Sequence, residues 1–140
     1  MTHTHANWRK ETLAVAAGRP AREAGNPVNT PISVSSTYHH FSQRDYVREG
    51  SDTVAAFKAA LGSLDGGFAV AFSSGMAAIA AIATSLPAGA RIITPVTMYL
   101  GAAELWDDVK SLGKAEVTEA DITDTAAVIK ALGDRASLLW

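Results

Sequence analysis

The chain has 140 residues, 48% of them hydrophobic and 19% charged, which is enough to bury the core of about one domain. A formal net charge of -2 argues against a general binder of nucleic acid or of anionic membranes, and the absence of cysteine excludes disulfides, thiolate metal sites and cysteine nucleophiles. The N-terminus lacks the basic-then-apolar order of a secretion signal. We therefore expect a cytoplasmic protein that has no membrane span and no metal site.

Residues 1–50 differ in composition from the rest of the chain. A short helix is expected at residues 8–17, and residues 18–46 are dense in Pro, Gly, Asn, Ser and Thr, which favour turns. The same stretch carries more aromatic and β-branched side chains than a solvated linker needs: Ile32, Val34, Tyr38, Phe41 and Tyr46. We expect residues 1–50 to form an N-terminal arm that packs on a neighbouring subunit; a partly disordered extension is the alternative.

From residue 51 onward, helical and strand patterns alternate. Helices are expected at residues 53–64, 76–86, 101–112 and 123–132, and strands at 68–72, 91–95, 115–117 and 136–140. Ser51 or Asp52 is expected to cap the first of these helices. The alternation predicts an α/β fold with a mostly parallel sheet. Because no helix follows the last strand to cover its second face, we expect residues 51–140 to be the first part of a larger domain.

A serine- and glycine-containing turn joins the expected strand 68–72 to the helix that follows. Ser73, Ser74 and Gly75 precede this helix, so the backbone N–H groups of Gly75, Met76 and Ala77 should be free at its N-terminus. Such a terminus favours an anion such as phosphate. The alternative is an ordinary turn in which Ser74 only caps the helix. The sequence contains neither a P-loop, nor a dinucleotide-binding glycine motif, nor a hydrolase nucleophile elbow.

Two further positions suggest ligand contacts. Tyr46 and Arg48 are two residues apart, so in extended backbone their phenol and guanidinium would point to the same target, such as a cluster of anionic oxygens. A surface arginine beside a half-buried tyrosine is the alternative. Tyr99 follows the strand 91–95, and ligands of parallel sheets bind beyond the carboxyl ends of strands. Its ring could stack on a planar ligand, or it could pack under a loop.

Taken in order, these segments resemble the Cys/Met-metabolism (trans-sulfuration) family of pyridoxal-phosphate (PLP) enzymes, which includes cystathionine γ-synthases and γ-lyases. The matching stretches are residues 29–38, the Tyr46-x-Arg48 pair, residues 53–67, residues 72–79 and residues 99–101. The resemblance covers only the N-terminal portion of such an enzyme. It implies an N-terminal arm followed by the first part of the mostly parallel sheet of a PLP fold-type I large domain.

The resemblance also implies roles for individual residues. Ser74, Gly75 and Met76 match the turn that binds the cofactor phosphate, and Tyr99 matches the tyrosine that stacks on the pyridine ring, which makes it the one catalytic residue expected in this chain. Tyr46 and Arg48 match the pair that reaches the phosphate in a neighbouring subunit. Arm exchange within a homo-oligomer, usually a tetramer, is therefore expected. Two departures stand out: Ser51-Asp52 replaces the common Asn-Pro, and Tyr99-Leu-Gly-Ala replaces Tyr-Gly-Gly-Thr.

The implied reaction is β/γ-elimination or γ-replacement on a small amino-acid substrate: cystathionine, methionine or activated homoserine. In the family, the Schiff-base lysine and the residues that hold the pyridine nitrogen and the substrate carboxylate come after the part that this chain matches. The remainder would be a second chain or a missing segment, and we do not expect residues 1–140 to catalyse the reaction alone. The alternatives are a non-catalytic truncated remnant and a binding domain for phosphate ligands.

Overall fold

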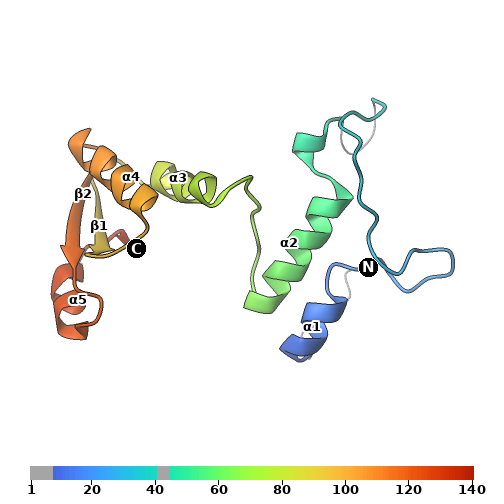
Figure 1. Ribbon diagram of the computed structural model, residues 1–140, viewed down its shortest axis with the longest axis horizontal. Helices are drawn as coiled ribbons and strands as arrows, with labels where there is room; N and C mark the ends of the chain where they lie inside the picture. Colours follow the sequence, from blue (N-terminus) through green and yellow to red (C-terminus); the bar gives the residue numbers. More distant parts are fainter. Residues whose placement is uncertain (1–7, 41–44) are drawn as a thin grey trace. The chain divides into compact units, whose positions relative to one another are not determined.

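The computed structural model describes residues 8–40 and 45–140. Phe41, which the sequence assigns to the arm, lies outside these ranges. The described residues form two compact units that divide between Ala71 and Phe72, and Figure 1 labels the helices and strands of each. We describe the two units separately.

The first unit contains two α-helices, α1 (Lys10–Ala16) and α2 (Asp52–Asp65), and a 3-10 helix, η1 (Val47–Glu49). Ser51 is buried and caps α2, since its hydroxyl accepts a hydrogen bond from the Val54 N–H at 3.2 Å. Gly66, in the left-handed conformation, ends the helix. Helix α1 packs against α2, and a Cβ on Gly18 would collide with the carbonyl oxygen of Ala56. Both expected helices and the Ser51 cap are confirmed.

The segment between α1 and η1 is irregular but is anchored to α2. The Thr53 hydroxyl donates to the Pro31 carbonyl at 3.1 Å and accepts from the Ser33 N–H at 2.9 Å. The apolar side chains next to this anchor remain in solvent, with Ile32 82% and Val34 93% exposed. Hydrogen bonds therefore hold the backbone here, while the apolar surface of the segment stays uncovered.

The second unit is an α/β structure. Its elements in chain order are α3 (Gly75–Ser85), β1 (Ala90–Pro95), α4 (Leu100–Ser111), β2 (Ala115–Ala120), α5 (Thr125–Leu132) and β3 (Leu138–Leu139). The sheet order is β2-β1-β3, and β1 pairs with both neighbours in parallel. Figure 1 shows β1 and β2 side by side with α4 next to them. The expected parallel α/β arrangement is confirmed.

The core of the second unit lies between the central strand and α4. Ile92 of β1 and Trp106 of α4 are almost completely buried, together with the small residues Ala90 and Ala102. The ring of Trp140 meets Trp106 edge to face, with 5.4 Å between the ring centroids. A strand with neighbours on both edges has little contact with water, which explains the almost continuous burial along β1.

One expected strand is wrong. Residues 68–72 are apolar and were expected to form a buried strand, yet they pair with no described strand, and Phe68 and Val70 are 105% and 70% exposed. Apolar composition indicates what a segment can bury, but a strand also needs a neighbour for its N–H and C=O groups. Two other strands differ in length: β2 continues to Ala120, and β3 is limited to Leu138–Leu139. No helix in the described ranges is long and apolar enough to cross a membrane.

Candidate functional site

The N-terminus of α3 offers backbone donors to an anion. Ser74 is the N-cap, and its hydroxyl accepts from the Ala77 N–H at 3.1 Å. The expectation of a free Ala77 N–H is therefore wrong, because the cap uses it. The N–H groups of Gly75 and Met76 make no hydrogen bond to any residue that the structure describes. A Cβ on Gly75 would have no atom within 4 Å, so the approach to these donors is open. An anion here would meet two free N–H groups at the positive end of an 11-residue helix.

Tyr99 lies beside this helix end. It follows β1 and is the N-cap residue of α4, without a side-chain hydrogen bond to the helix. A Cβ added to Gly101 would lie 2.9 Å from Cε1 of Tyr99 and 3.0 Å from Sδ of Met76. The tyrosine ring and the methionine side chain therefore both approach the Cβ position of Gly101, and the structure brings Tyr99 near the first turn of α3. The ring is 66% exposed, which leaves it accessible to a planar ligand.

Tyr46 and Arg48 also lie together, but not as expected. The sequence predicts extended backbone through the pair, whereas Val47, Arg48 and Glu49 form the 3-10 helix η1. The guanidinium nevertheless lies over the Tyr46 ring, with its carbon 4.5 Å from the ring centroid. Both side chains are exposed, and Arg48 forms no ion pair within the described parts of the chain. The pair thus presents a cation and a phenol to solvent from the first unit.

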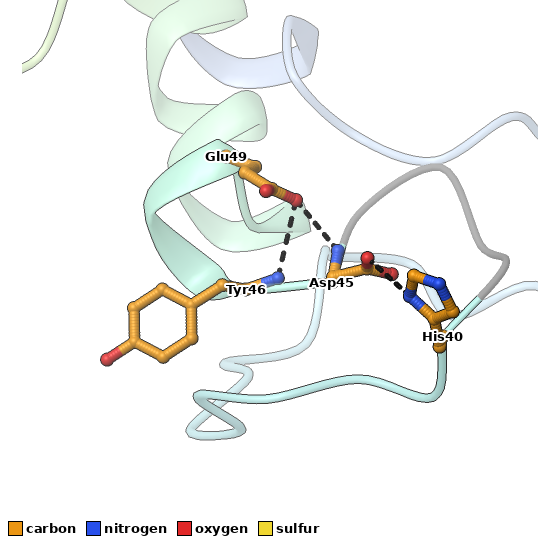
Figure 2. Close-up of polar contacts among 4 residues, drawn as sticks. All are labelled: His40, Asp45, Tyr46 and Glu49. Carbon is orange, nitrogen blue, oxygen red and sulfur yellow. Dashed lines mark hydrogen bonds and ion pairs between the residues drawn. The ribbon is translucent and has the colours of Figure 1, made fainter.

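The backbone around this pair is held by acidic side chains, as Figure 2 shows. Oε2 of Glu49 accepts from the N–H of Asp45 at 2.7 Å and from that of Tyr46 at 3.3 Å. Nδ1 of His40 lies 2.8 Å from Oδ2 of Asp45. In the figure the phenol of Tyr46 points away from all three of these side chains. The polar network therefore leaves the Tyr46 phenol free of these three side chains.

One carboxylate of the second unit has a perturbed pKa. Asp121 follows β2, and the hydrogen bonds that its Oδ1 accepts from the Thr123 hydroxyl (2.7 Å) and N–H (2.9 Å) lower its pKa. Asp121 is fully exposed. Residues 8–40 and 45–140 contain no cluster of three or more His, Cys, Asp or Glu that could hold a metal ion.

Two contributors were missed from the sequence. Gly101 leaves room for the Tyr99 ring, and the sequence signal for it was a glycine two residues after a tyrosine at the start of an expected helix. Glu49 follows Tyr46 at the three-residue spacing of a capping box, although tyrosine is not a usual first residue of that motif. Tyr46 and Arg48 belong to one unit, and Ser74, Gly75, Met76 and Tyr99 to the other.

Comparison with known proteins identifies the relatives of this chain. Residues 11–140 match the model of the "Cys/Met metabolism PLP-dependent enzyme" family. The chain is 35% identical over 137 residues to a cystathionine gamma-synthase of Mycobacterium tuberculosis, covering 92% of this chain and 35% of the relative. It is 33% identical over 138 residues to the cystathionine gamma-synthase of Escherichia coli, covering 94% of this chain and 36% of the relative. It thus spans about a third of the length of these relatives.

Solved structures show the same fold. The crystal structure of metB from Corynebacterium glutamicum superposes with a TM-score of 0.83 at 28% identity, covering 96% of this chain and 37% of that one. The cystathionine gamma synthase of Xanthomonas oryzae in complex with cystathionine gives 0.81 at 30% identity, covering 94% and 36%. These neighbours confirm the expected fold class, the first part of a PLP fold-type I enzyme. The chain belongs to the Cys/Met-metabolism family of PLP-dependent enzymes.

Proposed function

We propose that residues 1–140 are the N-terminal part of a trans-sulfuration enzyme that acts on cystathionine, methionine or activated homoserine. The reaction would be β/γ-elimination or γ-replacement, and this chain would hold the cofactor rather than complete the chemistry. The observation that carries the proposal is the juxtaposition of two free N–H groups, at Gly75 and Met76, with the exposed ring of Tyr99.

The residues present fit PLP. Its phosphate needs donors at a positive helix end, which the start of α3 supplies, and its planar ring needs an exposed aromatic side chain, which Tyr99 supplies. The Ser74 hydroxyl is already bound to the N–H of Ala77, and its second lone pair and its proton remain for the phosphate. When bound, PLP acts as an electron sink for carbanions formed on the amino-acid substrate.

The chain's own residues would bind and orient. The N–H groups of Gly75 and Met76 would fix the phosphate, and Tyr99 would set the plane of the ring, so that the reacting carbon is held in one place relative to the remainder of the enzyme. The absence of a Cβ at Gly101 leaves the space that the edge of the Tyr99 ring occupies. Tyr99 is the side chain of this chain that we place against the reacting part of the cofactor.

The first unit suggests an oligomer with arm exchange. Arg48 and the Tyr46 phenol are exposed and have no anion beside them among the described residues, while Ile32 and Val34 of the arm are almost fully exposed. We propose that the arm packs on a neighbouring subunit of a homotetramer, where Tyr46 and Arg48 reach the cofactor phosphate. We also propose a cytoplasmic location, as expected from the sequence.

The test is cofactor affinity in the whole protein that contains this chain. Ser74→Asp keeps a capping oxygen but places a negative charge at the phosphate position, so we expect weaker binding of PLP, by tenfold or more, and unchanged binding of pyridoxal, which lacks the phosphate. Ser85→Asp adds the same charge at the far end of the same helix, about 16 Å away, and should leave both affinities unchanged. Equal PLP affinity in Ser74→Asp and wild type would refute the phosphate site. Inorganic phosphate binding without any preference for PLP would instead favour a general phosphate-binding domain.

A further inference from the structure

The carboxylate of Glu49 holds the backbone on which the Tyr46–Arg48 pair is built. Its Oε2 atom accepts from two consecutive N–H groups, those of Asp45 and Tyr46, at 2.7 and 3.3 Å (Figure 2). Both donors come just before η1, and Glu49 is the last residue of η1. The Glu49 side chain thus bonds back to the backbone that precedes its own helical turn, as the glutamate of a capping box does.

Other contacts hold the same short segment from the opposite side. The Tyr38 N–H donates to the Asp45 carbonyl at 3.0 Å, and the Val47 N–H donates to the Ser36 carbonyl at 2.9 Å. Thr37 and Tyr46 form an isolated antiparallel bridge. Glu49 accepts hydrogen bonds from the N–H groups of Asp45 and Tyr46, which the bridge does not use, so the Tyr46 backbone is held both by the bridge and by Glu49.

The hydrogen bonds of Glu49 fix the turn that carries Arg48. The guanidinium lies over the Tyr46 ring while Val47, Arg48 and Glu49 turn back in η1, so the position of Arg48 relative to that ring is the one that this turn gives it. Cation–π contacts between exposed groups contribute little by themselves, so the turn and not the contact sets the geometry. A residue that closes the turn therefore controls the pair.

We infer that Glu49 is a positioning residue for the Tyr46–Arg48 pair: it binds no ligand itself but keeps the pair in the arrangement that accepts an anionic phosphate. The inference rests on the proposed function of the pair. Charge alone predicts the opposite effect, since a carboxylate near a phosphate site opposes the phosphate and its removal should strengthen binding. Positioning and simple repulsion thus differ in the sign of their effect.

The experiment compares Glu49→Ala and Glu49→Gln in the whole protein, with PLP and pyridoxal as probes. We expect Glu49→Ala to bind PLP about fivefold more weakly, with pyridoxal affinity unchanged and with loss of hydrogen-exchange protection at the amides of Asp45 and Tyr46. Glu49→Gln keeps an accepting oxygen and should retain both the protection and the PLP affinity of the wild type. Glu23→Ala is the matched control, because it removes an exposed glutamate of the same unit, whose carboxylate accepts no hydrogen bond from the described residues.

Two results would overturn the inference, and they can be told apart by Arg48→Gln. If Glu49→Ala binds PLP as tightly as wild type or more tightly while Arg48→Gln binds it more weakly, the pair holds the phosphate and Glu49 does not position it. If Arg48→Gln also leaves PLP affinity unchanged, the proposed function of the pair fails, and the role of Glu49 fails with it.

Discussion

The substitution Gly101→Ala tests whether the Tyr99 ring is held in place by the space that a glycine leaves. A Cβ at this position would lie 2.9 Å from Cε1 of Tyr99 and 3.0 Å from Sδ of Met76. Carbon atoms in ordinary contact are about 3.5–4.0 Å apart, so the edge of the ring has to move by at least about 0.6 Å. Since the ring is 66% exposed, it can move without unfolding anything.

The expected effects on stability and on cofactor binding differ. Alanine in place of glycine in a helix stabilises by about 0.5–1 kcal/mol, which offsets part of the steric cost, so the free energy of unfolding should change by less than about 1 kcal/mol. Aromatic stacking contributes about 0.5–1.5 kcal/mol, so a displaced ring should weaken PLP binding by about two- to twelvefold. The variant should therefore be as stable as the wild type but bind PLP more weakly.

The assay is a PLP titration of the whole protein together with methyl NMR of methionine. Sδ of Met76 and Cε1 of Tyr99 lie 3.0 and 2.9 Å from the same point, the Cβ position of Gly101, so the chemical shift of the Met76 methyl group should respond to a movement of the ring without cofactor. Gly67→Ala is the matched control, because a Cβ there would have no atom within 4 Å. An unchanged Met76 shift and unchanged PLP affinity in Gly101→Ala would refute the steric argument. A moved ring with unchanged affinity would show instead that Tyr99 does not stack on the cofactor.

Three further substitutions test the fold and its electrostatics. Ser74→Ala removes the cap on the Ala77 N–H and should lower the free energy of unfolding by about 1 kcal/mol in urea denaturation; no change would mean that the cap is not formed in solution. Trp106→Ala empties the core between β1 and α4 and should cost about 3–5 kcal/mol, and a loss below about 1 kcal/mol would contradict the burial. Thr123→Ala removes one donor to Asp121 and should raise the pKa of that carboxyl toward its ordinary value in an NMR titration, whereas an unmoved pKa would contradict the hydrogen bond. Because the folded-state pKa is lowered, the stabilisation from this bond is present above the unfolded-state pKa and is lost as the pH falls through the folded-state value.

Much of the secondary structure of both units could be predicted from the sequence because its signals are local. The helix caps by Ser51 and Ser74 each depend on a hydroxyl that lies three residues before the N–H that it binds. The helices depend on the regular spacing of apolar residues along one face. The parallel pairing of β1 with β2 follows from the helix between them, since a strand that returns through a helix pairs in parallel. The positions of Gly75, Met76 and Tyr99 at element ends follow from the same signals.

Other features depend on what lies next to a segment in space. Residues 68–72 have the composition of a buried strand, but no described strand pairs with them, and composition cannot supply a neighbour. The turn at η1 is held by hydrogen bonds that Glu49 accepts from residues before it and by a bridge between Thr37 and Tyr46. The predicted extended backbone through Tyr46 and Arg48 was therefore wrong, although the two side chains do lie close together. The steric role of Gly101 depends on two side chains, at positions 76 and 99 and therefore 23 residues apart in the sequence, that both approach its Cβ position in the folded chain.

The sequence by itself therefore determined the order of helices and strands, the helix caps and the family resemblance, because each depends on residues that are close together along the chain. The tertiary structure decided which N–H groups at α3 stay free, how Tyr99 and Met76 both approach Gly101, and how Arg48 comes to lie over Tyr46. Those features are set by distances between atoms that the sequence separates, and only packing and hydrogen bonding in the folded chain fix them.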